Sequence, residues 1–119
     1  TTTLTWNTET VDVGGYHDTS TNTSRFTIPT GKTGYFLWSM NIRWNSSTSG
    51  IRQALFYKNG TQISILDATT SSAGLSYVSA TLVLSLSAGD YLEIKTFQNS
   101  GGNLDVANAS SASIVYLGA

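Results

Sequence analysis

Apolar and polar residues alternate with a period of two along several stretches of the chain, most clearly in "YFLWSMNIRW" at 35–44. A period of two predicts a half-buried β-strand. The stretch "YVSATLVLSLS" at 77–87 repeats the pattern, and "DYLEIKTFQ" at 90–98 places Leu92 and Ile94 on one face. The predicted core faces of the first two strands are Phe36, Trp38, Met40, Ile42 and Trp44, and Val78, Ala80, Leu82, Leu84 and Leu86.

Turn signals separate these strands at short intervals. Asn59 and Gly60 lie between two apolar runs within 51–66, and both residue types tolerate the positive φ angles of a type I′ hairpin. The stretches "GKTG" at 31–34, "AGD" at 88–90 and "NSGGN" at 99–103 predict further turns. No stretch predicts a helix.

Three stretches rich in Ser, Thr, Asn and Gly, at 17–24, 45–50 and 67–74, predict exposed loops. Together with the strands, these turns and loops predict an all-β protein. We expect an antiparallel sandwich or jelly roll of about eight to ten strands.

The composition is that of one β domain with little charge. Only 11% of the 119 residues are charged, the net charge is −1 and the basic residues are scattered. No nucleic-acid partner is expected, because such binding needs a clustered basic face. The chain has no Cys, which excludes disulfides and thiolate metal sites. No apolar run is long enough to span a bilayer, so we expect no membrane insertion.

The segment "RFTIPTGKTGYFLW" at 25–38 resembles the signature of the complement globular-head and tumour-necrosis-factor-like jelly-roll family. In that family an aromatic residue and a Thr precede a Pro, a Gly follows, and aromatic residues alternate on the next strand. The matching positions are Phe26, Thr27, Pro29, Phe36 and Trp38, whereas Gly31 and Gly34 flank the family's Gly position.

The resemblance continues in order through nearly the whole chain from Trp6. The stretches "VDVGGYHDTS", "YKNGTQI", "LVLSLSAGDYLEI" and "SASIVYLGA" are similar to four further family segments. Family members usually have another strand upstream. Residues 1–119 are therefore expected to be a single domain, either the C-terminal head of a longer protein or a minimal variant.

The resemblance implies a tight homotrimer. The last strand would lie in the middle of one sheet, between the core and a neighbouring subunit, and "IVYLGA" at 114–119 is apolar enough for both contacts. The sheet facing the threefold axis would contain the strands at 35–44, 77–87 and 113–118. The residues opposite the core set would then form the trimer interface: Tyr35, Leu37, Tyr77 and Val83, with Tyr116 or Leu117 depending on register.

Residues that could perform catalysis or bind a metal are few. His17, the only His, lies in "GYHDTS" and is expected to be a solvent-exposed turn residue. The acids form no spaced pair of the kind that glycosidases use, so no catalytic residues are assigned and no enzyme is expected. Asp67 and Asp105 offer oxygen ligands to calcium, but no cluster of loop acids accompanies them. We therefore expect no cofactor, with calcium kept as the alternative.

Aromatic side chains at loops are the remaining candidates for binding, because sugar sites combine aromatic faces with amide and hydroxyl groups. Trp38 is expected in the core. Trp44 ends a strand, so it lies either at a rim or at the end of the core. The candidate receptor-binding residues are Tyr16, His17, Trp44 and Asn45.

The low charge, missing Cys and short loops resemble viral members of the family more than animal ones. We expect a non-enzymatic homotrimeric module on a virion surface: the head of a bacteriophage fibre or spike that binds a host-surface glycan or protein. The first alternative is a capsid decoration protein that contacts the capsid protein, which a reading frame of about this length would favour. The second is an extracellular carbohydrate-binding module or glycan-active enzyme, which the missing catalytic constellation disfavours.

Overall fold

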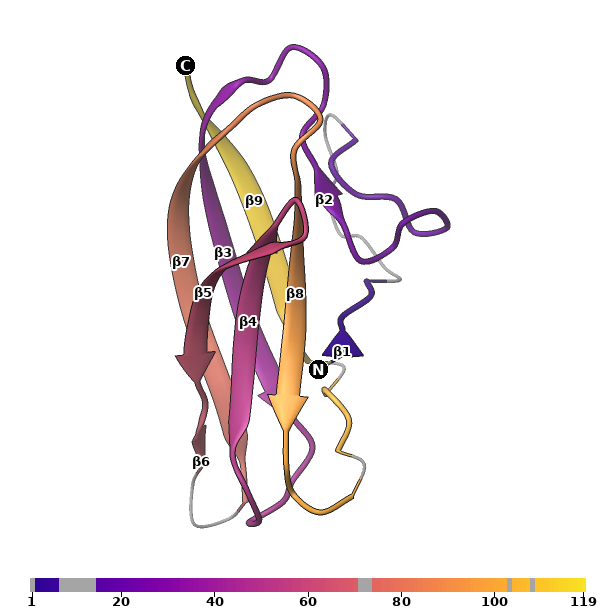
Figure 1. The fold of residues 1–119 in the computed structure, drawn as a ribbon, viewed down its shortest axis with the longest axis vertical. Helices are drawn as coiled ribbons and strands as arrows, with labels where there is room; N and C mark the ends of the chain where they lie inside the picture. Colours follow the sequence, from indigo (N-terminus) through magenta and orange to yellow (C-terminus); the bar gives the residue numbers. More distant parts are fainter. Residues whose placement is uncertain (1, 7–14, 71–73, 103, 108) are drawn as a thin grey trace.

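Two antiparallel β-sheets packed face to face form the protein in the computed structural model (Figure 1). The structure describes residues 2–6, 15–70, 74–102, 104–107 and 109–119, and no helix occurs among them. The described strands are β1 (Thr2–Thr3), β2 (Phe26–Thr27), β3 (Gly34–Trp44), β4 (Arg52–Lys58), β5 (Thr61–Asp67), β6 (Thr69–Thr70), β7 (Ser76–Leu86), β8 (Tyr91–Gln98) and β9 (Ser111–Gly118).

The chain changes sheet repeatedly as it runs through these strands. One sheet has the order β1-β8-β4-β5, with β2 also paired to β8, and the other has the order β6-β7-β3-β9. Successive strands therefore cross between the sheets after β2, β3, β5, β7 and β8, as they do in a jelly roll. The predicted all-β antiparallel sandwich is confirmed.

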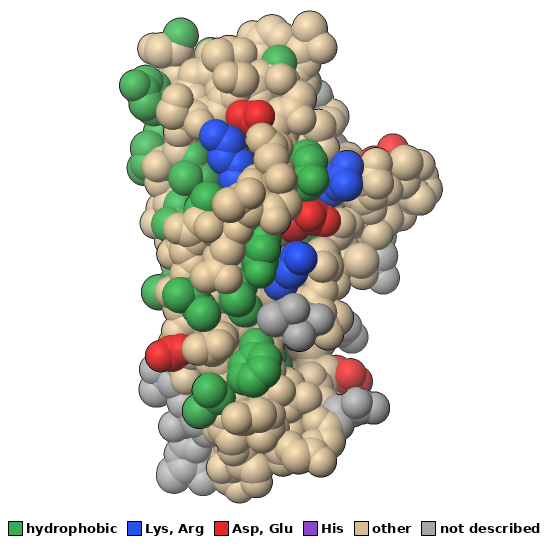
Figure 2. Space-filling model, viewed as in Figure 1, with side chains coloured by type: hydrophobic (Ala, Val, Ile, Leu, Met, Phe, Trp, Pro, Cys, Tyr) green, Lys and Arg blue, Asp and Glu red, His purple; other side chains and the backbone are tan. Residues whose placement is uncertain are grey.

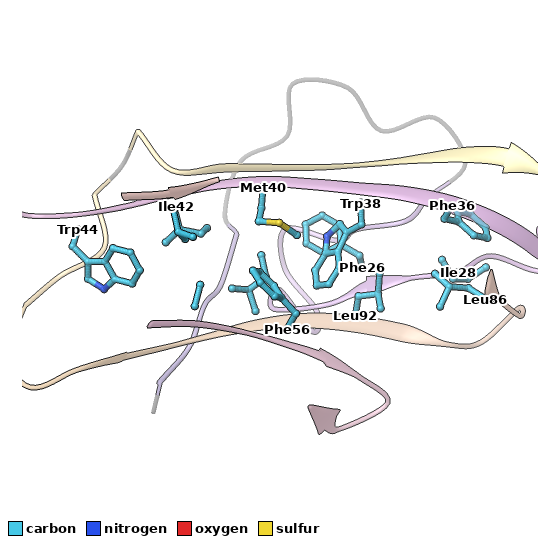
Figure 3. Close-up of a cluster of buried hydrophobic side chains, with 13 residues drawn as sticks. Phe26, Ile28, Phe36, Trp38, Met40, Ile42, Trp44, Phe56, Leu86 and Leu92 are labelled. Atoms are coloured by element: carbon cyan, nitrogen blue, oxygen red, sulfur yellow. The ribbon is translucent and has the colours of Figure 1, made fainter. Parts of the chain in front are cut away.

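The core lies between the two sheets and is rich in aromatic rings (Figure 3). Trp38 of β3 meets Phe56 of β4 edge-on, with ring centroids 5.7 Å apart, and Phe26 of β2 packs against the same indole at 6.2 Å. Each such fully buried side chain contributes about 1.5–3 kcal/mol. The predicted core face of β3 is confirmed, because all five of its residues are buried: Phe36, Trp38, Met40, Ile42 and Trp44.

The turn between β4 and β5 has the predicted geometry. Asn59 and Gly60 have φ angles of 52° and 81°, as a type I′ hairpin requires. The predicted loop at 67–74 is wrong in part, because Thr69 and Thr70 form β6, which pairs with β7. Thr favours strands as readily as turns, so a Thr-rich stretch does not distinguish the two.

A buried arginine holds the loop between β3 and β4. Arg52 is 1% exposed, and its guanidinium donates hydrogen bonds to the carbonyl oxygens of Ser47 (2.8 Å), Gly50 (2.9 Å) and Ser49. Its Nε has no partner among the described residues. These bonds give the loop at 45–50 a defined shape although it has no regular secondary structure.

The last strand, β9, pairs antiparallel with β3 from Tyr35 to Asn41. Among the described residues β3 is its one partner, so the expected central position of the last strand stays a prediction. The first part of "VDVGGYHDTS", at 11–14, lies outside the described residues.

Candidate interaction surface

The outer face of the four-stranded sheet is the surface that the sequence analysis assigned to subunit contacts. Strands β3, β7 and β9 belong to one sheet, as predicted. Strand β3 lies between the other two, and its outward residues alternate with its core residues. Leu37 is directly opposite Val83 on β7 and Val115 on β9. Side chains that are directly opposite on one face of antiparallel strands are close enough to pack together.

An apolar cluster occupies one end of this face. Val83 is 63% exposed, and Tyr35, Val115 and Leu117 are each more than half exposed, whereas Leu37 is half-buried between its neighbours. We call these five residues the apolar cluster. Contiguous exposed apolar side chains on one sheet face indicate an interaction site rather than an ordinary solvated surface.

A groove lies next to the apolar cluster, over the middle of the same three strands. It has a volume of about 480 Å³ and is lined mainly by short polar side chains. Ser39 and Thr81 are directly opposite each other in it, with their hydroxyl oxygens 3.3 Å apart. We call this region the hydroxyl groove, and its outward-facing residues are Ser39, Asn41, Ser79, Thr81, Ser111 and Ser113.

Asn41 differs from the other residues of the hydroxyl groove. Its Oδ1 is buried and has no hydrogen-bond partner among the described residues. Ser79 and Ser111 are its cross-strand neighbours on β7 and β9. A buried acceptor without a donor costs about 1–3 kcal/mol, so Asn41 is an unusual residue for the middle of a sheet.

Charge separates the two outer faces of the sandwich. Among the described outward residues of β3, β7 and β9 the one charged side chain is Arg43, at the end opposite the apolar cluster. The five-stranded sheet carries Lys58, Glu93 and Lys95 on or beside its outer face, and Figure 2 shows basic and acidic side chains there. The outer face of β7, β3 and β9 is therefore nearly neutral.

The structure places most of the predicted interface residues on this face and corrects one. Tyr35, Leu37, Val83 and Leu117 belong to the apolar cluster, and Tyr77 lies farther along, opposite Arg43. The prediction for Tyr116 is wrong, because its ring packs against Phe36 at 5.0 Å and its hydroxyl donates to the carbonyl of Thr33 (3.2 Å). Sequence reasoning missed Val115, which lies two residues before Leu117 and therefore shares its face.

The predicted receptor-binding residues do not form one exposed site. Trp44 is 3% exposed and closes the end of the core, so its assignment as a receptor contact is wrong. Asn45, the next residue, is exposed, and its N–H donates to the carbonyl of Asp105 (2.8 Å). Burial of the Trp44 indole is favourable because so large an aromatic ring removes much apolar area from water.

Tyr16 and His17 lie apart from Asn45 and belong to the packed surface beside β2. The ring of His17 lies 5.7 Å from that of Phe26, and its Nε2 donates to the carbonyl of Thr23 (2.9 Å). Tyr16 meets Phe36 edge-on at 6.2 Å. Both side chains are half-buried, so the expectation that His17 is a solvent-exposed turn residue is wrong.

Two tyrosines on the five-stranded sheet have one ring face covered by a cation. The Lys95 Nζ lies 4.3 Å from the ring centroid of Tyr57, and the guanidinium carbon of Arg25 lies 4.0 Å from that of Tyr91. These cation–π contacts contribute about 0.5–1 kcal/mol each at exposed sites. A sugar would have to displace the cation before it could stack on that face.

The comparisons give no family or relative. No protein-family model matches the chain, and no curated protein is similar enough to count as a match.

Among the described residues, no group of three or more His, Asp or Glu side chains lies close enough together to hold a metal ion. Asp67 and Asp105, the calcium ligands considered from the sequence, therefore belong to no such group. The part of the chain that the structure describes also contains no helix long and apolar enough to cross a membrane.

Proposed function

We propose that this chain is a non-enzymatic surface module that acts as a homotrimer, with the outer face of β7, β3 and β9 turned toward the threefold axis. The observation that carries the proposal is the apolar cluster, whose members Val83, Val115 and Leu117 are more than half exposed on a nearly uncharged face. A neighbouring subunit that covers this cluster removes it from water.

The energetics favour a large, symmetric contact. Fully burying a Val or Leu side chain contributes about 1.5–3 kcal/mol, so covering one that is half exposed contributes on the order of 1 kcal/mol. A trimer gains this contribution in each of its three copies. A face with almost no charge also favours a partner without charge, and another copy of the same face meets that requirement.

Binding rather than catalysis is the role that the polar residues support. His17 donates to a backbone carbonyl within its own loop. Asp18 accepts hydrogen bonds from the backbone N–H of Ser20 and Thr21, and the Ser20 bond is the main reason that the pKa of Asp18 is lowered. Both side chains thus act in the structure of the loop at 17–24.

The proposed setting is a virion surface, where the trimer forms the head of a bacteriophage fibre and attaches to a host-surface glycan or protein. The support for this setting is the resemblance of the segments around Phe26 and Trp38 to tumour-necrosis-factor-like jelly rolls, together with the low charge and the absence of Cys. The two face-to-face antiparallel sheets are the architecture that this resemblance implies.

Two measurements test the proposal. Sedimentation velocity at protein concentrations of roughly 1 to 100 µM should give a particle with about three times the 12.7 kDa mass of one chain. A monomer over that concentration range would contradict the proposed trimer. Gold-labelled antibody on cryo-EM images of the virus that encodes the chain should mark the fibre tips. Label on the capsid shell would instead identify a decoration protein, and particles without label would overturn the viral setting.

A further inference from the structure

Asn41 lies at the centre of the face that the proposed trimer turns toward its axis. It is on β3, the middle strand of β7, β3 and β9, and it lies in the hydroxyl groove beside the apolar cluster. If the threefold axis runs along β3, the outward residues of β3 are the ones closest to that axis. The Asn41 side chains of the three subunits are then the amide groups of this face that lie nearest to one another.

The surroundings of Asn41 leave room for such an approach. Its cross-strand neighbours are Ser79 and Ser111, and the next pairs along the groove are Ser39 with Thr81 and Ser39 with Ser113. These side chains are short and uncharged, so they let another backbone come close without burying a charge. Hydroxyl groups also both donate and accept hydrogen bonds, which makes the groove complementary to a copy of itself.

The unpartnered oxygen of Asn41 supplies the second observation. No donor among the described residues of one chain reaches the buried Oδ1, whereas an amide side chain carries both a donor and an acceptor. A change of rotamer that brings the whole amide to the mouth of the groove would take Oδ1 out of its buried position and put both Oδ1 and Nδ2 within reach of a neighbour's amide. The cost of the unsatisfied acceptor is then removed by assembly.

We propose that the three Asn41 amides of the trimer form a closed ring around the axis, in which each Nδ2 donates to Oδ1 of the next copy. This inference rests on the proposed function, because it requires a threefold assembly through this face. The ring gives the polar half of the interface a fixed register, while the apolar cluster supplies most of the affinity. A buried Asn at the seam of a coiled coil sets register and stoichiometry in the same way.

A cysteine at this position tests the geometry directly. The chain has no Cys, so Asn41→Cys carries one thiol per subunit. Mild oxidation of the assembled protein should link two of the three chains, giving a reducible dimer band with about two thirds of the protein, because a disulfide needs Cα atoms about 4.4–6.8 Å apart. Asn45→Cys, exposed beyond the end of β3, is the matched control and should remain monomeric on the same gel.

A carboxylate at the same position tests the energetics. Three Asp side chains near one axis repel one another when ionised, and this repulsion raises their pKa. Asn41→Asp should therefore assemble near pH 4, and its dissociation constant should rise about 100-fold or more by pH 7.5. Asn45→Asp should show no such change. Circular dichroism at both pH values checks that the monomers remain folded.

The possible results separate the ring from the trimer itself. A wild-type monomer would overturn the proposed function and the ring together. A wild-type trimer in which Asn41→Cys does not cross-link and Asn41→Asp assembles equally at both pH values would overturn the ring alone. Cross-linking of Asn41→Cys together with pH-dependent assembly of Asn41→Asp would support both. If Asn41→Asp does not fold at pH 7.5, the cross-linking result decides.

Discussion

The side-chain amide of Asn59 donates a hydrogen bond to Oδ1 of Asp90 (2.9 Å), which joins the turn between β4 and β5 to the turn between β7 and β8. The backbone N–H of Tyr91 donates to Oδ1 of Asn59 (2.9 Å) in return. The carboxylate of Asp90 also accepts from the N–H of Ser87 (2.9 Å) and lies 3.7 Å from Nζ of Lys58. These contacts close one end of the sandwich.

Replacing Asp90 by Asn should destabilise the protein by about 1–2 kcal/mol at pH 7, because charge-assisted hydrogen bonds to the turn are lost. The Ser87 N–H, then Asn59 and Lys58, lower the pKa of Asp90 in the folded protein. A lowered folded pKa means that the contribution is present above the unfolded value of about 3.9 and disappears as pH falls through the folded pKa. Urea unfolding from pH 7 to 2.5 measures the difference between the two proteins.

Both proteins in that comparison contain Asp18, whose lowered pKa therefore cancels in the difference. Asp105→Asn, which changes an exposed carboxylate outside these turns, is the control and should leave the unfolding free energy nearly unchanged at pH 7. A difference between wild type and Asp90→Asn that is the same at pH 7 and pH 2.5 would contradict the role assigned to the carboxylate.

Replacing Val83 by Arg should prevent assembly without unfolding the monomer. The side chain is 63% exposed in one chain, so the fold tolerates the larger residue, whereas an unpaired charge buried between subunits costs several kcal/mol. Size-exclusion chromatography with light scattering should therefore give a monomer for Val83→Arg. Ile65→Arg, which is 44% exposed on the outer face of β5, is the matched control and should stay assembled. Loss of assembly only in the control would place the interface on the other sheet.

The strands and the core could be predicted because apolar residues alternate there with polar ones. Single residues separate Phe36, Trp38 and Met40, and a period of two has one physical solution in a sandwich, with that face inward. The hairpin at Asn59 could be predicted for a similar reason, because few residues other than Asn and Gly accept its backbone angles.

Other features could not be predicted because the local pattern allowed two answers. In "IVYLGA" both faces of the strand are apolar, so periodicity alone could not decide whether Tyr116 or Leu117 points outward. The pairing of β9 with β3 settles that question. Trp44, at the end of a strand, also allowed two positions, the rim or the end of the core.

The central residues of the candidate surface were also hidden in the sequence. Asn41 is an ordinary polar residue of an alternating strand, and its unpartnered oxygen becomes visible only when β7 and β9 are in place. Arginine is usually a surface residue, yet Arg52 is buried because three loop carbonyls accept hydrogen bonds from its guanidinium. Neither the surroundings of Asn41 nor those of Arg52 produce a recognisable pattern of residues along the sequence.

Replacing Arg52 by Met should destabilise the protein by roughly 2–4 kcal/mol, because three carbonyl oxygens of the loop at 45–50 lose their donor. Arg52→Lys should also be destabilised, since one ammonium cannot reproduce the planar fork of a guanidinium. Urea denaturation measures both variants. Arg25→Met, which loses mainly its contact with Tyr91, is the control and should cost less than about 1 kcal/mol. Equal stability of Arg52→Met and wild type would show that the loop keeps its shape without these bonds.

Replacing Gly34 by Ala should weaken the contact between β3 and β9. A Cβ at this position would collide with the carbonyl group of Gly118, the partner of Tyr35 across the two strands. The backbone of β9 must then move away from β3 where the apolar cluster lies, so we expect a loss of about 1–3 kcal/mol of stability and weaker assembly. Gly31→Ala is the matched control, because a Cβ there meets nothing within 4 Å and the cost is that of the positive φ angle of 86° alone, about 1 kcal/mol. Thermal unfolding and sedimentation of both variants make the comparison. If Gly31→Ala lowers stability as much as Gly34→Ala and both variants assemble alike, the close approach of β9 to β3 does not stabilise the subunit contact.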